Sequence, residues 1–107
     1  MAREVKWAEA ATNDLDAVAD HIAQDSPNYA ASFVCEARDA ARSLTHLADR
    51  GRIVPEWDDA SVRELFIGNY RLLYQVTEQI VFVIGFIHGA RDLRALWQRE
   101  GRLPSGM

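Results

Sequence analysis

The spacing of apolar side chains predicts a short strand followed by a helix at the start of this chain of 107 residues. Val5 and Trp7 alternate with charged neighbours, which is the period of a half-buried strand. The apolar period then lengthens to that of a helix covering about residues 8–24. The apolar stripe of this helix is predicted to consist of Ala11, Leu15, Val18 and Ile22.

A second helix is predicted to begin at Pro27, because proline loses no hydrogen bond at the first helical position and Ser26 is a good N-cap. It is expected to run to about Leu47, with alanines that permit close approach to the first helix. Gly51 ends this unit, and residues 50–61 are expected to form a connecting loop. The apolar face of the second helix is predicted to hold Phe33, Ala37, Ala40, Leu44 and Leu47.

The second half of the chain changes to a period of two and is rich in β-branched and aromatic residues. Gly68-Asn69 is a two-residue hairpin signal between strands at 62–67 and 70–77. The segment 80–87 is almost entirely apolar. Such a segment is typical of a central strand covered on both faces.

The end of the chain predicts one more short helix, after which residues 101–107 are expected to fray. Together these elements predict an α+β fold. It has an N-terminal strand, two antiparallel helices packed on an antiparallel sheet, and a short C-terminal helix. The apolar residues of that last helix are Leu93, Leu96 and Trp97.

Composition limits the kind of protein that this chain can form. Its length fits a single domain over residues 1–107, with one core. The sequence contains no run of about 18 apolar residues, so no membrane span is predicted. The N-terminal segment has no apolar signal region, so the protein is expected in the cytoplasm.

The sequence predicts neither a metal site nor a cofactor. His21, His46 and His88 fall in three separate segments and lack the spacing of metal ligands. Cys35 is the only cysteine, so it cannot form an internal disulfide. Its apolar neighbours predict a buried structural thiol.

Charge is divided unevenly between the two halves of the chain. Residues 1–49 carry four basic and nine acidic side chains, whereas residues 50–107 carry eight arginines and seven acids. The net charge of −4 leaves no overall basic footprint, so bulk electrostatics does not favour a nucleic-acid partner. The first half is best explained as an acidic, solvated helical surface.

The two predicted hairpins determine which side chains share a face of the sheet. A two-residue first turn places Phe66 opposite Arg71, and a two-residue second turn places Arg71 opposite Phe86. Glu64, Arg71 and His88 are then expected to project from one face. A slip of one residue in either hairpin would overturn this assignment.

This expected face has two interpretations. In the first, Arg71 stacks on Phe66 and pairs with Glu64 on a half-exposed sheet, while His88 ends a strand. In the second, the face binds a polyanion or forms a catalytic pocket. Arginine presents a planar fork suited to phosphate, and histidine titrates near neutrality.

Three motifs occur in order in the second half of the chain: Gly51-Arg52-Ile53-Val54-Pro55-Glu56, Arg63-Glu64-Leu65-Phe66-Ile67-Gly68-Asn69-Tyr70-Arg71-Leu72-Leu73-Tyr74 and Ile87-His88-Gly89-Ala90-Arg91-Asp92. With the two predicted N-terminal helices, they resemble the RelE/ParE superfamily of bacterial toxins. The resemblance covers nearly the whole chain. It implies a small toxin that arrests growth unless a cognate antitoxin is bound.

Within that superfamily, the resemblance to RelE-type nucleases implies one set of catalytic residues. These proteins cleave mRNA on the ribosome without a metal ion. The matching positions are Glu56 as general base, Arg71 as phosphate stabiliser and His88 as general acid.

Two departures look more like the ParE branch, whose members poison DNA gyrase. The chain has a single lysine, Lys6, whereas the nucleases share a strongly basic surface. It also continues from residue 89 into a further helix, in place of the tyrosine that often closes the nucleases. This resemblance carries over no catalytic residues. The target-binding candidates are Arg63, Glu64, Tyr74 and Arg91, with Arg63 expected beside Tyr74 on the face away from Arg71.

Three functions therefore stay open at this point. The first is a ParE-like poison of DNA gyrase, and the second is a RelE-like ribosome-dependent mRNA endonuclease. The third is a degenerate module that binds an antitoxin and has no activity. Each implies an antitoxin as partner, and none determines the oligomeric state.

Overall fold

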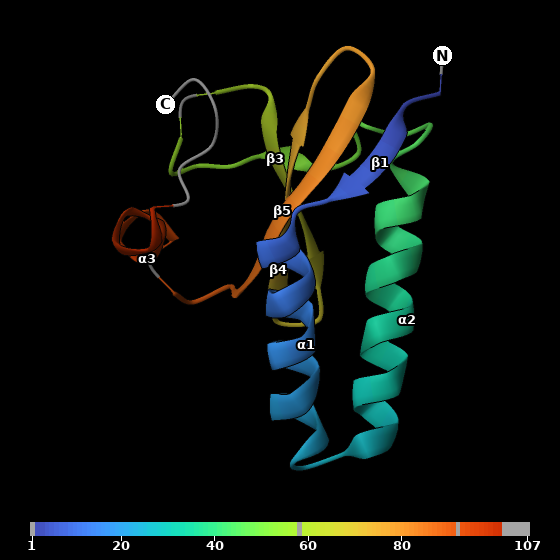
Figure 1. Cartoon of the computed structure of the whole chain (residues 1–107), viewed down its shortest axis with the longest axis vertical. Helices are drawn as coiled ribbons and strands as arrows, with labels where there is room; N and C mark the ends of the chain where they lie inside the picture. The colour runs from blue at the N-terminus through green and yellow to red at the C-terminus, as the bar shows by residue number, and fades with distance from the viewer. Residues whose placement is uncertain (1, 58, 92, 102–107) are drawn as a thin grey trace.

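The computed structural model describes residues 2–57, 59–91 and 93–101. Two long helices lie side by side on one side of a sheet, and a short third helix lies on the other side (Figure 1). This is the predicted α+β arrangement. In chain order the elements are β1 (Glu4–Trp7), α1 (Glu9–Ala23), α2 (Pro27–Ser43), β2 (Arg52–Ile53), β3 (Val62–Ile67), β4 (Tyr70–Val76), β5 (Ile80–His88) and α3 (Leu93–Glu100).

The two long helices form as their sequence predicts, except at the end of α2. The Ser26 side chain accepts a hydrogen bond from the Tyr29 amide and caps α2, with Pro27 at the first helical position. The expectation that α2 continues to Leu47 is wrong, since the helix stops at Ser43 and Leu47 is 57% exposed. The Ser43 hydroxyl donates to the Ala40 carbonyl, and such local bonds compete with helix continuation.

The five strands form one sheet in the order β1-β5-β4-β3-β2. β1 pairs with β5 in parallel and the other pairs are antiparallel, so the sheet is mixed where a wholly antiparallel one was expected. β2 is a two-residue edge strand inside the segment predicted to be a loop. So short a strand leaves no periodic pattern in the sequence.

The first hairpin has the predicted register. Gly68 has a positive φ of 58°, and the turn pairs Ile67 with Tyr70 and Phe66 with Arg71. Glycine reaches this backbone region without the steric penalty that a Cβ atom brings. The prediction of a two-residue turn is confirmed.

The second hairpin departs from the predicted register because β5 carries a bulge. Tyr74 pairs with Val83 but Leu73 pairs with Gly85, so Ile84 has no partner of its own in β4. A bulge of one residue moves every later side chain to the opposite face. The predicted pairing of Arg71 with Phe86 is therefore wrong.

Two clusters of buried side chains hold the layers together. The larger lies between the helical pair and the sheet and includes Phe33, Leu44, Leu72 and Tyr74. The smaller lies on the other face, where α3 and the segment after β2 cover the sheet. Its buried members are Val54, Trp57, Val62, Leu73, Ile87, Leu93 and Trp97.

Two further burial predictions differ from the structure. Cys35 is exposed on the outer side of α2, so the expectation of a buried thiol is wrong. β5 is an interior strand as predicted, but its Phe82 is 36% exposed, so its first half is covered on one face only.

No helix within the described residues is long and apolar enough to span a membrane. Residues 102–107, predicted to fray, and Asp92 lie outside the described residues.

Candidate functional site

Arg71 is the centre of the most highly charged cluster in the interior. It lies on β4 and is only 4% exposed. Its Nη1 and Nη2 atoms donate to the two carboxylate oxygens of Glu56 at 2.8 and 2.7 Å. This is the bidentate geometry in which a guanidinium binds a carboxylate most strongly.

A second carboxylate completes the environment of Arg71. Its Nε donates to Oε1 of Glu64 at 2.5 Å, and Glu64 is 1% exposed. The other oxygen of Glu64 accepts a hydrogen bond from Arg52 on β2. The Arg52 guanidinium lies 5.1 Å from the centre of the exposed Phe66 ring, within cation–π distance.

These four side chains, Arg52, Glu56, Glu64 and Arg71, form a charge-balanced network that we call the Arg71 network. Hydrogen bonds from Arg71 hold the pKa of Glu56 below its usual value, against the opposing effect of burial. Hydrogen bonding to Glu56 raises the pKa of Arg71 further. Glu56 and Arg71 are therefore both charged at neutral pH, and the guanidinium fork is already occupied.

The Arg71 network also fixes the segment that follows β2. Glu56 is adjacent to Trp57, whose indole packs against Trp97 of α3 with ring centroids 5.7 Å apart. Trp57 and Trp97 are 2% and 1% exposed. The salt bridge between Glu56 and Arg71 thus holds this segment on the sheet face, where it packs against α3.

His88 lies on the other face of the sheet. It pairs with Tyr70, and the two rings meet edge to face with centroids 5.3 Å apart. His21 of α1 lines the same two surface pockets as His88 and Tyr70. The prediction that His88 shares a face with Glu64 and Arg71 is wrong, because the bulge at Ile84 reverses its side.

The remaining predicted site residues divide into buried and exposed groups. Tyr74 is fully buried; its hydroxyl donates to the Ala48 carbonyl and accepts from the Gly51 amide. Burial raises the pKa of that phenol. Arg63 pairs with Tyr74 as predicted and donates to the Gly51 carbonyl at 2.8 Å.

Arg91 is exposed in the turn between β5 and α3 and lines the larger of the two pockets beside His88. That pocket is about 340 Å³ in volume. Glu64 and Tyr74, by contrast, contribute no exposed surface of consequence. Of the four target-binding candidates, Arg91 is exposed and Arg63 is half-buried, so Arg91 is the most accessible to a partner.

The arrangement brings Glu56 and Arg71 together and leaves His88 apart. A base, a phosphate-binding cation and an acid must converge on one substrate to cleave RNA. Here the sheet separates the acid candidate from the other two. Among the described residues, the side chains that bind the Arg71 guanidinium are the carboxylates of Glu56 and Glu64. Within residues 2–57, 59–91 and 93–101, no group of three or more histidine, cysteine or acidic side chains is placed to hold a metal ion.

Sequence reasoning missed Arg52 as a member of the cluster, because it lies in the segment predicted to be a loop. It also missed the bulge. Gly85 was the available signal, since a glycine within an apolar strand often marks a bulge.

Comparison with known proteins identifies relatives over most of the chain. Residues 5–93 match the model of a family described as the ParE toxin of the type II toxin–antitoxin system parDE. The toxin RelE2 of Caulobacter vibrioides is 34% identical over 89 residues, which are 82% of this chain and 97% of that protein.

Two solved structures share the fold at low sequence identity. One is the chromosomal ParDE toxin–antitoxin system from P. aeruginosa, with a TM-score of 0.66 and 22% identity over 80% of this chain and 95% of that one. The other is the toxin–antitoxin complex RelBE2 from Mycobacterium tuberculosis. It gives a TM-score of 0.56 and 22% identity over 82% of this chain and 99% of that one.

Proposed function

Because the chain belongs to the ParE toxin family of type II toxin–antitoxin systems, we propose that it arrests growth by binding DNA gyrase and that a cognate antitoxin neutralises it. The proposal has two parts. The toxin acts by occupying a protein surface, without cleaving RNA, and a second protein blocks that action.

The position of His88 relative to Arg71 is the observation that carries the first part. A general acid must reach the leaving oxygen while a cation contacts the same phosphate. His88 lies on the helical face and Arg71 on the opposite face, under Glu56 and Glu64. No single bound phosphate can contact both side chains across a packed sheet.

The hydrogen-bond partners of Arg71 support the same conclusion. A free guanidinium would attract phosphate, but two carboxylates already take its donors. Binding RNA at this position would require Glu56 to leave a bidentate pair. The bulk charge of −4 offers no compensating attraction.

We further propose that Arg91 contributes directly to the target interface. Its side chain is exposed next to a pocket that also contains Leu96 and Trp97 of α3. Arginine beside aromatic and aliphatic side chains is a common composition for the centre of an interface. The other three candidates contribute indirectly, because they hold the strands and turns that carry this surface in place. They are Arg63, Glu64 and Tyr74.

The second part of the proposal, neutralisation by an antitoxin, rests on the partners of the related proteins. Both structural neighbours were solved as toxin–antitoxin systems, and the matching family model describes a toxin of such a system. An antitoxin encoded beside this chain is therefore the expected partner. Co-expression with the adjacent open reading frame should yield a stable complex.

The decisive experiment induces the toxin in a bacterial host and records two responses. A gyrase poison should cause filamentation and a DNA damage response, and the purified chain should inhibit supercoiling by DNA gyrase. The matched control is co-induction with the antitoxin, which should abolish both effects. Rapid loss of translated mRNA without DNA damage would favour the alternative function, a RelE-like mRNA endonuclease. The similarity to RelE2 is the observation that supports this alternative.

A further inference from the structure

The pocket that contains Arg91 lies between α1 and α3, beside the second half of β5. β1 pairs with β5 only from Ile80 to Val83, so the rest of β5 extends past β1 and the pocket opens there. One wall belongs to α3 and includes Leu96 and Trp97. The shape of this surface therefore depends on where α3 lies.

α3 depends on side-chain packing for its position. It has eight residues, and isolated helices shorter than about 12 residues are marginal in water. Among its described side chains, Leu93 and Trp97 are the buried ones, at 0% and 1% exposure. Whatever holds these two side chains also holds the helix.

Trp97 packs against a residue from outside the regular elements. Its partner, Trp57, lies in the turn between β2 and β3, with ring centroids 5.7 Å apart and ring planes at 43°. Both rings belong to the buried cluster on this face of the sheet. A displaced Trp57 would leave a void beside Trp97, and buried voids are costly. The position of α3 is therefore coupled to the position of Trp57.

Glu56 attaches this turn to the sheet. The Val54 amide donates to the Val62 carbonyl at 3.0 Å, whereas the Trp57 amide donates to the Val54 carbonyl within the turn itself. β2, which precedes the turn, has only two residues. The bidentate pair of Glu56 with Arg71 adds an attachment one residue away from Trp57.

We propose that the salt bridge between Glu56 and Arg71 positions the target interface. It acts through Trp57 and Trp97, which hold α3 at the pocket that contains Arg91. Glu56 and Arg71 are thus positioning residues, and Arg71 itself is buried beneath the surface. This inference rests on the proposed function in taking DNA gyrase as the target.

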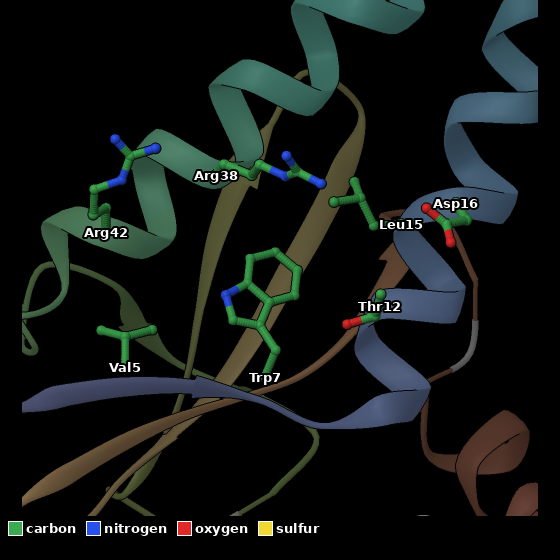
Figure 2. A pocket seen from close by; sticks show the side chains of 7 residues that line it. All are labelled: Val5, Trp7, Thr12, Leu15, Asp16, Arg38 and Arg42. Atoms are coloured by element: carbon green, nitrogen blue, oxygen red, sulfur yellow. The ribbon is translucent and has the colours of Figure 1, made fainter.

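The helical face of the sheet provides an internal reference. Figure 2 shows Trp7, the third tryptophan, rising from β1 between α1 and α2. Its ring stacks on Phe86 with centroids 5.6 Å apart and packs against the other buried cluster. Loosening of the turn that carries Trp57 should therefore leave Trp7 unchanged.

The indole N–H signals of the three tryptophans test the route from Glu56 to α3. Glu56→Gln keeps the size of the side chain, but its amide nitrogen cannot accept the second hydrogen bond from Arg71. In the ¹⁵N-labelled chain, made by cell-free synthesis, the Trp57 and Trp97 signals should shift and the Trp7 signal should stay. A shift confined to Trp57 would overturn the inference, because the change would not reach α3.

Amide hydrogen exchange gives a second measure of the same route. In Glu56→Gln the backbone amides of α3 should exchange roughly tenfold faster or more, while those of α1 and α2 keep their rates. The matched control is Glu78→Gln, at an exposed glutamate in the turn between β4 and β5. It should leave α3 as it is in the unmodified chain. Equal exchange of α3 in the two variants would contradict the coupling.

Inhibition of supercoiling by purified DNA gyrase tests the functional role, in a reaction that contains no RNA. Glu56→Gln should need a roughly tenfold higher concentration for half inhibition, the effect of losing one well-packed interface contact. Glu78→Gln should inhibit as the unmodified chain does. Ala41→Gly destabilises the domain from within α2 and should also inhibit normally while folded. A similar loss in Ala41→Gly would reduce the effect to general stability and overturn the inference.

A double-mutant cycle tests whether the effect passes through Trp57. Trp57→Leu removes the ring contact with Trp97 but keeps an apolar side chain, and Trp57→Phe takes its place if the leucine variant does not fold. Adding Glu56→Gln to either should weaken inhibition no further. Losses that simply add would overturn this route.

The outcomes separate this inference from the proposed function. If the unmodified chain inhibits gyrase and Glu56→Gln inhibits equally well, the positioning role is overturned while the gyrase assignment stands. If the unmodified chain does not inhibit gyrase, the proposed function is overturned and the role of the salt bridge at that target falls with it.

Discussion

Arg71 and His88 project from opposite faces of the sheet, although they lie near one another on adjacent strands. Arg71 pairs with Ile87, and Tyr70 pairs with His88. Because neighbouring positions along a strand alternate between faces, this register places the two side chains apart. The bulge at Ile84 is the cause, and its consequence is that Arg71 has a structural environment made of carboxylates.

The first prediction is that Arg71 contributes to stability. Arg71→Ala leaves the buried Glu64 carboxylate with Arg52 as its cationic partner, and breaking a buried pair costs about 3–5 kcal/mol. The free energy of unfolding should fall by that amount in urea denaturation. Arg99→Ala, at an exposed site, should change it by about 0.5 kcal/mol or less. Equal effects of the two substitutions would contradict a structural role for Arg71.

The second prediction concerns pH and Glu56. Its pKa lies below the usual value chiefly because Arg71 donates hydrogen bonds to it. A lowered carboxyl pKa gives stability that is complete above the unfolded value and is lost as pH falls through the folded one. Glu56→Gln should therefore lower Tm at pH 7, and the difference should shrink below about pH 4. A Tm difference that is constant from pH 7 to pH 3 would mean that the Glu56 charge is not responsible.

The third prediction is that the Tyr74 hydroxyl holds the loop after α2 to the sheet. Tyr74→Phe keeps the ring but leaves the Gly51 amide and the Ala48 carbonyl without this partner. An unsatisfied buried group costs about 1–3 kcal/mol. Tyr29→Phe, on a half-exposed ring, is the control and should be close to neutral. Thermal unfolding compares them, and a neutral Tyr74→Phe would refute this role.

The fourth prediction concerns the first hairpin. Gly68→Val should destabilise the domain by roughly 1–3 kcal/mol, because φ is positive at this position and an added Cβ would lie 3.0 Å from the Tyr29 hydroxyl. Gly68→Asn should cost less, since asparagine adopts positive φ more readily. If the valine and asparagine variants melt together, backbone strain at residue 68 is not the determining factor.

The sequence was sufficient where apolar periodicity and turn chemistry acted together. It predicted α1, the start of α2 at Ser26-Pro27, and the Gly68 turn, because each depends on local preferences. It also predicted that Glu64 and Arg71 share a face, which follows from the first hairpin alone.

The rest depended on contacts between distant segments. The bulge at Ile84 lies in β5, which pairs with both β1 and β4, and Gly85 is the residue whose type suggested a bulge there. Arg52 belongs to the Arg71 network because β2 pairs with β3. No local sequence pattern indicated that pairing. The exposure of Cys35 depends on the rotation of α2, which apolar neighbours alone do not fix.

The central claim is that this toxin acts by binding a protein target and has no catalytic acid. The most direct measurement is growth inhibition by the His88→Gln variant at an expression level matched to that of the unmodified chain. Binding of the antitoxin is the check that the variant is folded. We predict toxicity within about threefold of the unmodified chain, because one exposed histidine contributes little to a protein interface. A loss of 10²–10⁴, roughly the contribution of a general acid, in folded protein that still binds antitoxin would contradict the account.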